Sequence, residues 1–418
     1  MNGEGIDRRR LLLRGLSMIG GLGGAGLLAR STHARSLANL AQPALWPNEA
    51  GRTLVLLQLS GGNDGLSTVI PHGDDRYHRS RNATRHEASE VLRIDGYRGL
   101  HPNLERMRVW YDEGRLAIIE GCGYVRPSRS HFKSLEIWHT ARAAGRNSGD
   151  GWVGRLCESA FAEDFDAKRV VHVGGTVPYS LHSAGHPASS FVIPEGYRWV
   201  GNESDIDSFS EAKREEDGKG KRRKNASLDH LRSVMNDARA SSAAIRTAAA
   251  RYRPTVEYPN DPFAEDLRTC AALIDSDIGT RILSLELRGF DTHSGQKGVH
   301  DNLMRRLDEG LSAFLADLEA SQAGRRTIVM AFSEFGRRVT ENASRGTDHG
   351  TAGPMFVAGH DVRGGLYGRH PSLQGLDGQD LVFTTDFRTV YATLIEACFG
   401  VKHDLVLGAR YPTLNLVA

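Results

Sequence analysis

The sequence predicts an α/β fold in which a doubly wound, mainly parallel β-sheet is flanked by helices. Three features of the 418 residues support this prediction. Short, continuous apolar runs typical of strands buried on both faces recur along the chain. Segments with apolar residues at helical spacing alternate with these runs. Clusters of Asp, Glu and His stand beside the runs, and open α/β sheets bind ligands beyond the carboxyl ends of their strands.

Five apolar runs define the expected strands. The first covers residues 53–60 (TLVLLQLS) and ends in the turn Gly61-Gly62-Asn63-Asp64-Gly65, which places a carboxylate at the end of the strand. The others cover residues 116–121, 282–287, 327–332 and 355–358. The third run closes on Asp291-Thr292-His293, the fourth leads into Ser333-Glu334-Phe335, and Asp348-His349-Gly350 precedes the fifth. We therefore expect the polar clusters to converge into one pocket.

Helices are expected between these strands. Residues 130–141 and the alanine-rich residues 227–252 have helix-like sequences, and apolar residues recur at helical spacing over 303–318. Residues 203–226 are strongly charged and contain glycine, which indicates a solvated, flexible surface insertion. We expect residues 45–418 to form a single domain, because α/β domains of this size often remain one unit.

The N-terminus resembles a twin-arginine signal peptide, which we assign to residues 1–34. Arg8, Arg9 and Arg10 precede three leucines, and a glycine-rich, weakly apolar run follows. A membrane anchor is the alternative, but this run is shorter than the roughly 20 residues that a bilayer crossing needs. We expect the Tat translocase as a transient partner, no stable membrane span, and a periplasmic or extracellular location. Cleavage after Ala34, Ala38 or Ala41 would suit such a signal.

Charge and cysteine usage exclude two classes of protein. Five arginines against two acids give residues 1–34 a charge of +3, so the rest of the chain, from a total of +2, carries −1. This near-neutral body lacks the broad positive field that attracts nucleic acid, and no nucleic-acid partner is expected. The four cysteines are widely separated and form neither a Cys-x-x-Cys pair nor zinc-ribbon spacing. They do not indicate a disulfide framework.

Six acidic and imidazole side chains beside the apolar runs are candidate metal ligands. They are Asp64, Asp291, His293, Glu334, Asp348 and His349. Oxygen and imidazole ligands suit Zn, Mn, Mg or Ca, and several acids brought together would repel one another without a cation. We expect one or two divalent ions at this site.

Each candidate also has a purely structural interpretation. Asp64 follows Gly-Gly-Asn and is a common turn residue, and Asp291-Thr292-His293 is compatible with a loop that contains an Asx turn. Asp348-His349-Gly350 is compatible with a cap, and Glu334 with a surface ion pair to a nearby arginine. The recurrence of such residues at the ends of separate strands favours the metal site.

Six motifs occur in a distinctive order along the chain: LVLLQLSGGNDG, RPSRSHF, GFDTHSGQ, AFSEFGR, TDHGTAGPMFVAG and TTDFRTVYATLIE. This order resembles the exported domain-of-unknown-function family 1501, which is regarded as a relative of alkaline phosphatases, sulfatases and nucleotide pyrophosphatases. The resemblance covers nearly the whole chain after the signal and implies an alkaline phosphatase-like fold. It also implies that Asp64 and Asp291 are metal-binding aspartates, that Glu334 replaces the Asp of an Asp-His-Gly motif, and that His349 closes the first metal site.

Two departures from the superfamily pattern change what the resemblance implies about the metals. Phe335 stands in place of the usual histidine, and the usual Asp-x-x-x-His arrangement is Asp291-x-His293 in this chain. Either change reduces the expected number of metals from two to one.

The nucleophile position also differs. The segment Val125-Arg126-Pro127-Ser128-Arg129-Ser130 resembles the sulfatase motif Cys-x-Pro-Ser-Arg-Ser, whose cysteine becomes formylglycine, but valine has no nucleophile. Ser130 or Ser128 is the candidate replacement, because a metal and a helix amino terminus both favour an alkoxide. The alternative is ordinary helix capping by one of these serines. His131 is a candidate ligand or acid/base group, or a residue of the helix surface.

These observations lead to a hypothesis about function. The chain is expected to be an exported metal-dependent hydrolase of phosphate, phosphodiester or sulfate esters, not of the formylglycine type, acting on a small-molecule or polymer substrate. Metal would polarise the ester and lower the pKa of Ser130 or of a bound water, while Arg129 or Arg337 would hold the anionic group. The alternative is a secreted non-catalytic binding or envelope-assembly protein that retains the fold. A mutase or transferase is disfavoured, because sugar-phosphate metabolites are cytoplasmic.

Overall fold

The computed structural model of the chain describes residues 51–143, 149–161, 166–198 and 226–418, with residues 226–237 described by their backbone alone. The proposed signal peptide at 1–34 lies outside the described residues. The charged insertion expected at 203–226 also lies outside them, except for Ala226, with which helix α8 begins.

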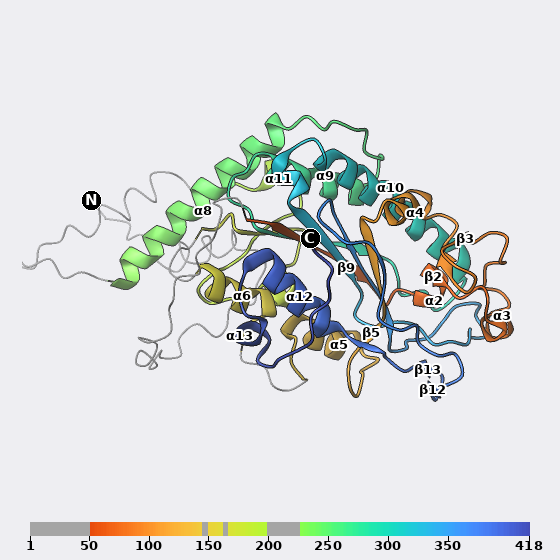
Figure 1. Cartoon of the computed structure of the whole chain (residues 1–418). Helices are drawn as coiled ribbons and strands as arrows, with labels where there is room; N and C mark the ends of the chain where they lie inside the picture. The colour runs from red at the N-terminus through yellow and green to blue at the C-terminus, as the bar shows by residue number, and fades with distance from the viewer. Residues whose placement is uncertain (1–50, 144–148, 162–165, 199–225) are drawn as a thin grey trace, which may run out of the picture.

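A nine-stranded sheet forms the centre of the described chain (Figure 1). Its strands follow the order β11-β5-β10-β9-β1-β8-β6-β7, and β14 also pairs with β5. The strands are β1 (Thr53–Ser60), β5 (Leu116–Gly123), β6 (Val170–Val173), β7 (Ser189–Phe191), β8 (Ile282–Arg288), β9 (Thr327–Phe332), β10 (Gly353–Ala358), β11 (Gly365–Tyr367) and β14 (Thr385–Asp386). The pairs are parallel except for those that β10 makes with β5 and β9. The predicted α/β fold with a mainly parallel sheet is confirmed.

Helices cover both faces of this sheet (Figure 1). They are α2 (Gly65–Thr68), α3 (Asp75–Ser80), α4 (Glu105–Asp112), α5 (His131–Thr140), α6 (Trp152–Phe161), α8 (Ala226–Arg251), α9 (Pro262–Asp275), α10 (Gln296–Leu318), α11 (Gln322–Arg325), α12 (Phe387–Phe399) and α13 (His403–Leu407), with short 3₁₀ turns η1 (Tyr179–Leu181) and η2 (Pro194–Gly196). Two small sheets complete the set: β2 (Val69–Ile70), β3 (Leu92–Arg93) and β4 (Gly99–Leu100), and β12 (Leu376–Asp377) with β13 (Asp380–Leu381).

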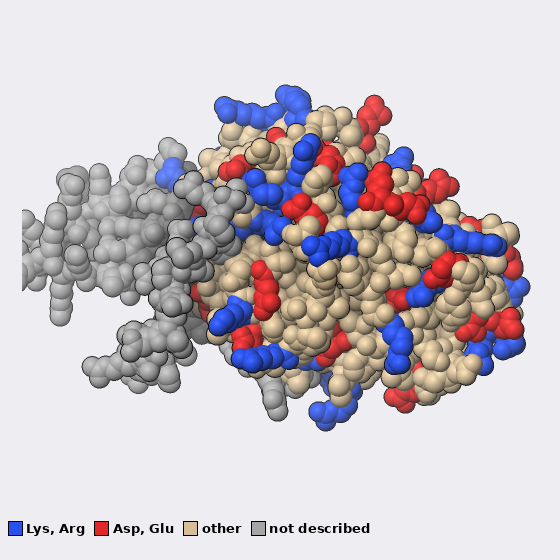
Figure 2. Space-filling view, viewed as in Figure 1, with Lys and Arg blue, Asp and Glu red and all other residues tan. Residues whose placement is uncertain are grey.

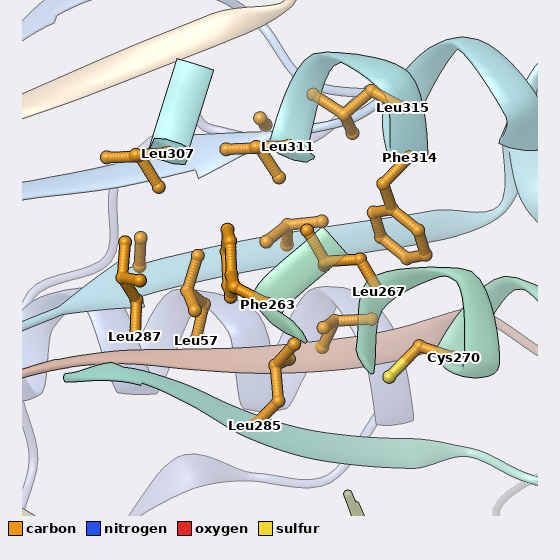
Figure 3. Packing of buried hydrophobic residues seen from close by; sticks show 14 of the residues in the cluster. Leu57, Phe263, Leu267, Cys270, Leu285, Leu287, Leu307, Leu311, Phe314 and Leu315 are labelled. Carbon is orange, nitrogen blue, oxygen red and sulfur yellow. The ribbon is translucent and has the colours of Figure 1, made fainter. Parts of the chain in front are cut away.

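The alternation of side chains along the strands divides the core into two layers. From β1, Val55 and Leu57 pack on one face against α9 and α10, whereas Leu54 and Leu56 pack on the other face against α5, α6 and α12. Figure 3 shows the first layer, in which Leu57 and Leu285 of the sheet lie opposite the apolar side chains of α9 and α10. This burial on both faces explains why the strand sequences are continuous apolar runs.

The surface and the cysteines agree with the composition. On the face shown in Figure 2, basic and acidic side chains are interspersed and neither sign dominates. The four cysteines are buried and unpaired, as their spacing predicts. Within the described ranges, no helix combines the length and apolar character that a membrane crossing requires.

Candidate metal centre

Three loops that carry predicted site residues meet at the carboxyl edge of the sheet, because β8, β1 and β9 are adjacent and parallel. Gly61, which follows β1, has φ +120°, and a Cβ there would lie 2.5 Å from the backbone nitrogen of Asp291. Only glycine therefore permits the loops after β1 and β8 to approach this closely. An isolated antiparallel bridge between Arg337 and His349 places the segment before β10 beside the loop after β9.

The central feature of this edge is a group of three potential ligand atoms on Asp291, His293 and His349. We call these three residues, together with His131, the strand-end cluster. The Nε2 atoms of His293 and His349 lie 2.9 Å apart. The Oδ1 atom of Asp291 lies 2.9 Å from Nε2 of His349 and 3.1 Å from Nε2 of His293. The side chains of Asp291 and His293 are nearly half exposed, at 49% and 44%, so the group is accessible from solvent.

The surroundings determine which ring nitrogens carry protons. Nδ1 of His349 lies 2.8 Å from the carbonyl oxygen of Arg129, and Nδ1 of His293 lies 3.3 Å from a carboxylate oxygen of Asp348. Both partners only accept hydrogen bonds, so each neutral ring carries its proton on Nδ1. The two Nε2 lone pairs then point at each other and at Asp291 Oδ1, an arrangement that requires a shared cation or added protons.

This donor set fits a divalent metal ion. A tetrahedral zinc with bonds of about 2.0–2.2 Å separates its ligand atoms by roughly 3.3 Å, close to the spacings of this cluster. Orientation of each ligating imidazole by a carboxylate or carbonyl on its other nitrogen is the usual arrangement in metal sites. Burial raises the pKa of Asp291, but the Arg337 guanidinium and His349 outweigh it and hold that pKa at about 2, so this ligand is ionised.

His131 extends the cluster. Its Nδ1 donates to Glu334 Oε1 at 2.8 Å, and its Nε2 faces Asp291 Oδ2 at 3.7 Å. The hydrogen bond to Glu334 raises the pKa of His131. Glu334 is buried and also accepts from the backbone of Gly61 at 3.0 Å, so it positions His131 and does not join the ligand group. Phe335 packs against the rings of His131 and His349, with centroids 4.9 and 4.7 Å away.

Asp64, another predicted ligand, has partners other than the strand-end cluster in the described structure, and its role as a ligand stays a prediction. Its carboxylate is fully buried and accepts from Arg81 Nη1 at 2.5 Å, from Gln296 Nε2 at 2.5 Å and from the hydroxyl of Ser67 at 3.0 Å. Burial raises the pKa of Asp64, but the charge of Arg81 outweighs it and lowers the pKa to about 2. A guanidinium therefore neutralises Asp64. No sequence pattern singles out Arg81 as its partner.

Arg337 is not placed to bind an anion. Its side chain is buried and donates to the carbonyls of Gly62 (2.8 Å), Phe290 (2.9 Å) and Thr347 (2.8 Å), and to Asp291 Oδ1 (2.7 Å). These bonds fasten the strand-end loops to one another, and the guanidinium has no open side for a ligand. The second anion-binding candidate, Arg129, has a side chain that is 48% exposed.

Ser130 stands directly before α5 and is exposed. It occupies the N-cap position with extended dihedral angles, but its side chain makes no capping hydrogen bond. Ser128 accepts a hydrogen bond from the Ser130 backbone at 3.3 Å and is the less exposed of the two. Ser130 is therefore the N-cap residue of α5 by position, as the capping interpretation expects, but its hydroxyl is not used for capping.

A second histidine and carboxylate cluster lies elsewhere and was not predicted. It consists of His86, His101 and Asp301, which offer ligand atoms within 4.8 Å of one another. Here the Asn103 backbone donates to His101 Nδ1 at 3.0 Å, so Nε2 carries the proton and donates to Asp301 at 2.9 Å. The histidines are buried, and this cluster is a hydrogen-bonded network without facing lone pairs.

The fold and the strand-end cluster define an α/β protein with a candidate metal centre at the carboxyl edge of its sheet. The chain belongs to the family described as protein of unknown function (DUF1501), whose model matches residues 130–403. The family expected from the order of motifs is therefore confirmed. A search of curated proteins found no match.

Several solved structures are similar to the chain at low identity. A sulfatase from Pseudoalteromonas sp. has 11% identity and a TM-score of 0.40, with 88% of this chain and 72% of that chain covered. An alkaline phosphatase superfamily protein from Vibrio parahaemolyticus has 11% identity and a TM-score of 0.36, with 86% and 70% covered. A putative sulfatase from Bacteroides thetaiotaomicron has 8% identity and a TM-score of 0.35, with 76% and 66% covered. Similarity at this level carries no argument about relationship or activity.

Proposed function

We propose that this protein is an exported, metal-dependent hydrolase of phosphate, phosphodiester or sulfate esters. The observation that carries the proposal is the convergence of His293 Nε2, His349 Nε2 and Asp291 Oδ1 within 3.1 Å, with the opposite nitrogens of both rings engaged by acceptors. These three residues would hold one divalent cation. When bound, the cation would stabilise negative charge on the ester and on the attacking oxygen.

The protein's own groups supply the remaining chemistry. The Ser130 hydroxyl is exposed, is not used for capping and precedes His131, so we assign it as the nucleophile. Its oxygen forms a bond to phosphorus or sulfur while the bond to the leaving alkoxide breaks. His131 takes the hydroxyl proton at Nε2 and passes it to the leaving group, and Glu334 holds the ring by its Nδ1 proton. Water then hydrolyses the seryl ester and regenerates the hydroxyl.

The proposal is tested with the purified full chain. Bound metal is measured by elemental analysis, and hydrolysis is assayed with an aryl phosphate, a bis-aryl phosphodiester and an aryl sulfate. Turnover of at least one ester is expected, and Ser130→Ala should lower kcat by at least about 1,000-fold, since the nucleophile is lost. Ser159→Ala, at an exposed position on α6, is the matched control. Stoichiometric metal without turnover of any ester class would contradict the proposal.

The alternative is a secreted binding or envelope-assembly protein that keeps one structural cation. The pairing of Asp64 with Arg81 favours it, because an internal guanidinium occupies a carboxylate that the resemblance assigns to metal. The accessible strand-end cluster and the exposed Ser130 hydroxyl, which makes no capping bond, favour the hydrolase. The same metal and turnover measurements distinguish the two functions.

Export by the Tat translocase is part of the proposal and rests on the arginines and apolar run of residues 1–34. Replacement of Arg8 and Arg9 by lysine should keep the full-length protein in the cytoplasm, as followed by cell fractionation. Equal export of this variant and the unchanged chain would exclude the twin-arginine route.

A further inference from the structure

Two arginines beside the strand-end cluster share one buried carboxylate. Asp380, in β13, has a side chain that is only 2% exposed. Arg129 donates to its Oδ2 from Nε at 2.8 Å and also from Nη2. Nε of Arg338 lies 3.9 Å from the other oxygen, Oδ1. Asp380 therefore anchors the Arg129 guanidinium by two hydrogen bonds and lies beside that of Arg338 as a longer ion pair.

Both arginines are tied to the strand-end cluster. The carbonyl of Arg129 accepts from His349 Nδ1 at 2.8 Å. The Arg338 backbone donates to the carbonyl of Asp348 at 3.0 Å, and its Nη1 lies 3.6 Å from the Asp348 carboxylate. The two guanidinium groups thus belong to the same edge of the sheet as the proposed ligands. The Arg129 backbone orients His349, and Asp348, which pairs with Arg338, orients His293.

The pair retains unused binding capacity. The two arginines face two carboxylates, Asp380 and, 3.6 Å from Arg338, Asp348, so the four side chains are neutral together. The Arg129 side chain is 48% exposed, and Arg338 is 29% exposed. Among the described residues, Arg129 Nη1 has no hydrogen-bond partner. Nε of Arg338 and Oδ1 of Asp380 are buried and likewise without one. The exposed part of each guanidinium can therefore donate to a ligand, and guanidinium donors beside a cation site suit an anionic group.

We propose that Arg129 and Arg338, positioned by Asp380, form a second anion subsite next to the strand-end cluster. The occupant is a sulfate, phosphate or carboxylate group of the substrate other than the one that is hydrolysed. Resting on the proposed function, this defines the substrate class as esters that carry at least two anionic groups, such as a multiply sulfated or phosphorylated molecule. Asp380 is a positioning residue in this scheme, since it acts through the two arginines.

The test measures binding independently of turnover. The probes are naphthalene-1,5-disulfonate and naphthalene-1-sulfonate, which chelate metal poorly, titrated into the metal-loaded full chain by calorimetry. Arg338→Gln and Arg129→Gln should each weaken disulfonate binding by about tenfold, the loss expected for one charge-assisted hydrogen bond. Monosulfonate binding should change less than about threefold. Arg305→Gln, an exposed arginine paired with Glu309 on α10, is the matched control and should leave both affinities unchanged.

Substitution of Asp380 separates positioning from charge, because the two effects change disulfonate affinity in opposite directions. Asp380→Asn removes a negative charge near the bound anion, so charge alone would tighten disulfonate binding. Loss of positioning instead weakens it, and Asp380→Glu should restore part of the affinity. Tighter binding in Asp380→Asn, or unchanged binding in both arginine variants, would overturn the subsite.

Hydrolase activity is measured separately from anion binding at the subsite. If the subsite and the activity both exist, Arg338→Gln raises KM for a dianionic aryl ester about tenfold with little change in kcat. Disulfonate binding that depends on the arginines without turnover of any ester would support the subsite and contradict the hydrolase. Ester turnover, combined with disulfonate affinities that the arginine substitutions leave unchanged, would support the hydrolase and contradict the subsite.

Discussion

The molecule contains two groups of histidines and aspartate with almost the same composition and different chemistry. In the strand-end cluster, acceptors hold the Nδ1 protons of His293 and His349, and the free lone pairs face Asp291. In the second cluster, a backbone N–H occupies the lone pair of His101, whose proton then faces Asp301. In the first arrangement Arg337 pairs with Asp291, but nothing lies between the two facing imidazole lone pairs. The second arrangement is already satisfied.

The contrast shows that proximity of ligand types does not define a metal site. Both groups hold imidazole and carboxylate atoms within 4.8 Å of one another. What distinguishes them is the second partner of each ring, which decides where the proton lies. Exposure adds to this, since Asp291 is half exposed whereas His86 and His101 are buried.

The largest effect is expected from loss of a ligand in the strand-end cluster. His349→Ala should weaken binding of Zn²⁺ by at least about 100-fold, because even outer-shell partners of metal ligands contribute 10–100-fold. His101→Ala, the matched change in the second cluster, should leave the metal affinity unchanged and lower the free energy of unfolding. Competition with a chromogenic chelator measures the affinity. Loss of metal in His101→Ala would reverse the assignment of the two clusters.

A smaller loss is expected when only the orientation of a ligand is removed. Asp348→Ala leaves the ligand atoms in place but takes the acceptor from His293 Nδ1, 3.3 Å away. Affinity for Zn²⁺ should fall by roughly 10–100-fold. The same chelator titration is used, with Asp377→Ala at an exposed position as the control. An unchanged affinity would mean that Asp348 does not fix the proton of His293.

The fold was predictable because each core strand has a local sequence pattern. The apolar runs at 53–60 and 327–332 coincide with β1 and β9, and the expected helix at 227–252 is shifted by one residue in α8. Burial on both faces of a parallel sheet requires apolar side chains at every position, so the pattern is strong. The antiparallel direction of β10 leaves no such trace, because a buried strand has the same composition in either direction.

The site was predictable only in part, because partners in space are not neighbours in sequence. The order of the strands brings Asp291 and His349 together across 58 residues, as their positions at strand ends indicated. Asp64 has the same sequence context, yet Arg81 neutralises it, and no pattern identifies that pairing. Asp380, likewise, lies in the short strand β13 without a motif around it and becomes relevant only through its contacts with Arg129.

The second cluster and its neighbour His300 should make stability depend on pH. His300 is buried, its Nε2 lies 3.2 Å from the Asn63 side-chain oxygen, and burial lowers its pKa to about 3. A histidine whose pKa is lower in the folded state stabilises the fold fully above its unfolded pKa of about 6.5. This contribution is lost as pH falls from about 6.5 toward 3, by about 2 kcal/mol at pH 5.

Urea unfolding at pH 7 and pH 5 measures this effect. His300→Gln should reduce the difference in unfolding free energy between the two pH values. Other buried histidines with a lowered pKa, such as His139, still contribute to this difference in the variant. His131 acts in the opposite direction, because its pKa is raised and its contribution is lost as pH rises. An equal pH dependence in His300→Gln and the unchanged chain would show that His300 does not stay neutral in the fold.

The smallest expected effect concerns Ser130, and its smallness is informative. A serine that caps a helix contributes about 1 kcal/mol, so its replacement by alanine would lower the free energy of unfolding by that amount. Because the Ser130 side chain makes no capping bond, Ser130→Ala should change stability by less than about 0.5 kcal/mol. Ser321, which caps α11 through Gly324, is the matched control and should cost about 1 kcal/mol as alanine. A large destabilisation in Ser130→Ala would return this residue to a capping role, and any loss of activity in the variant would then lose its catalytic meaning.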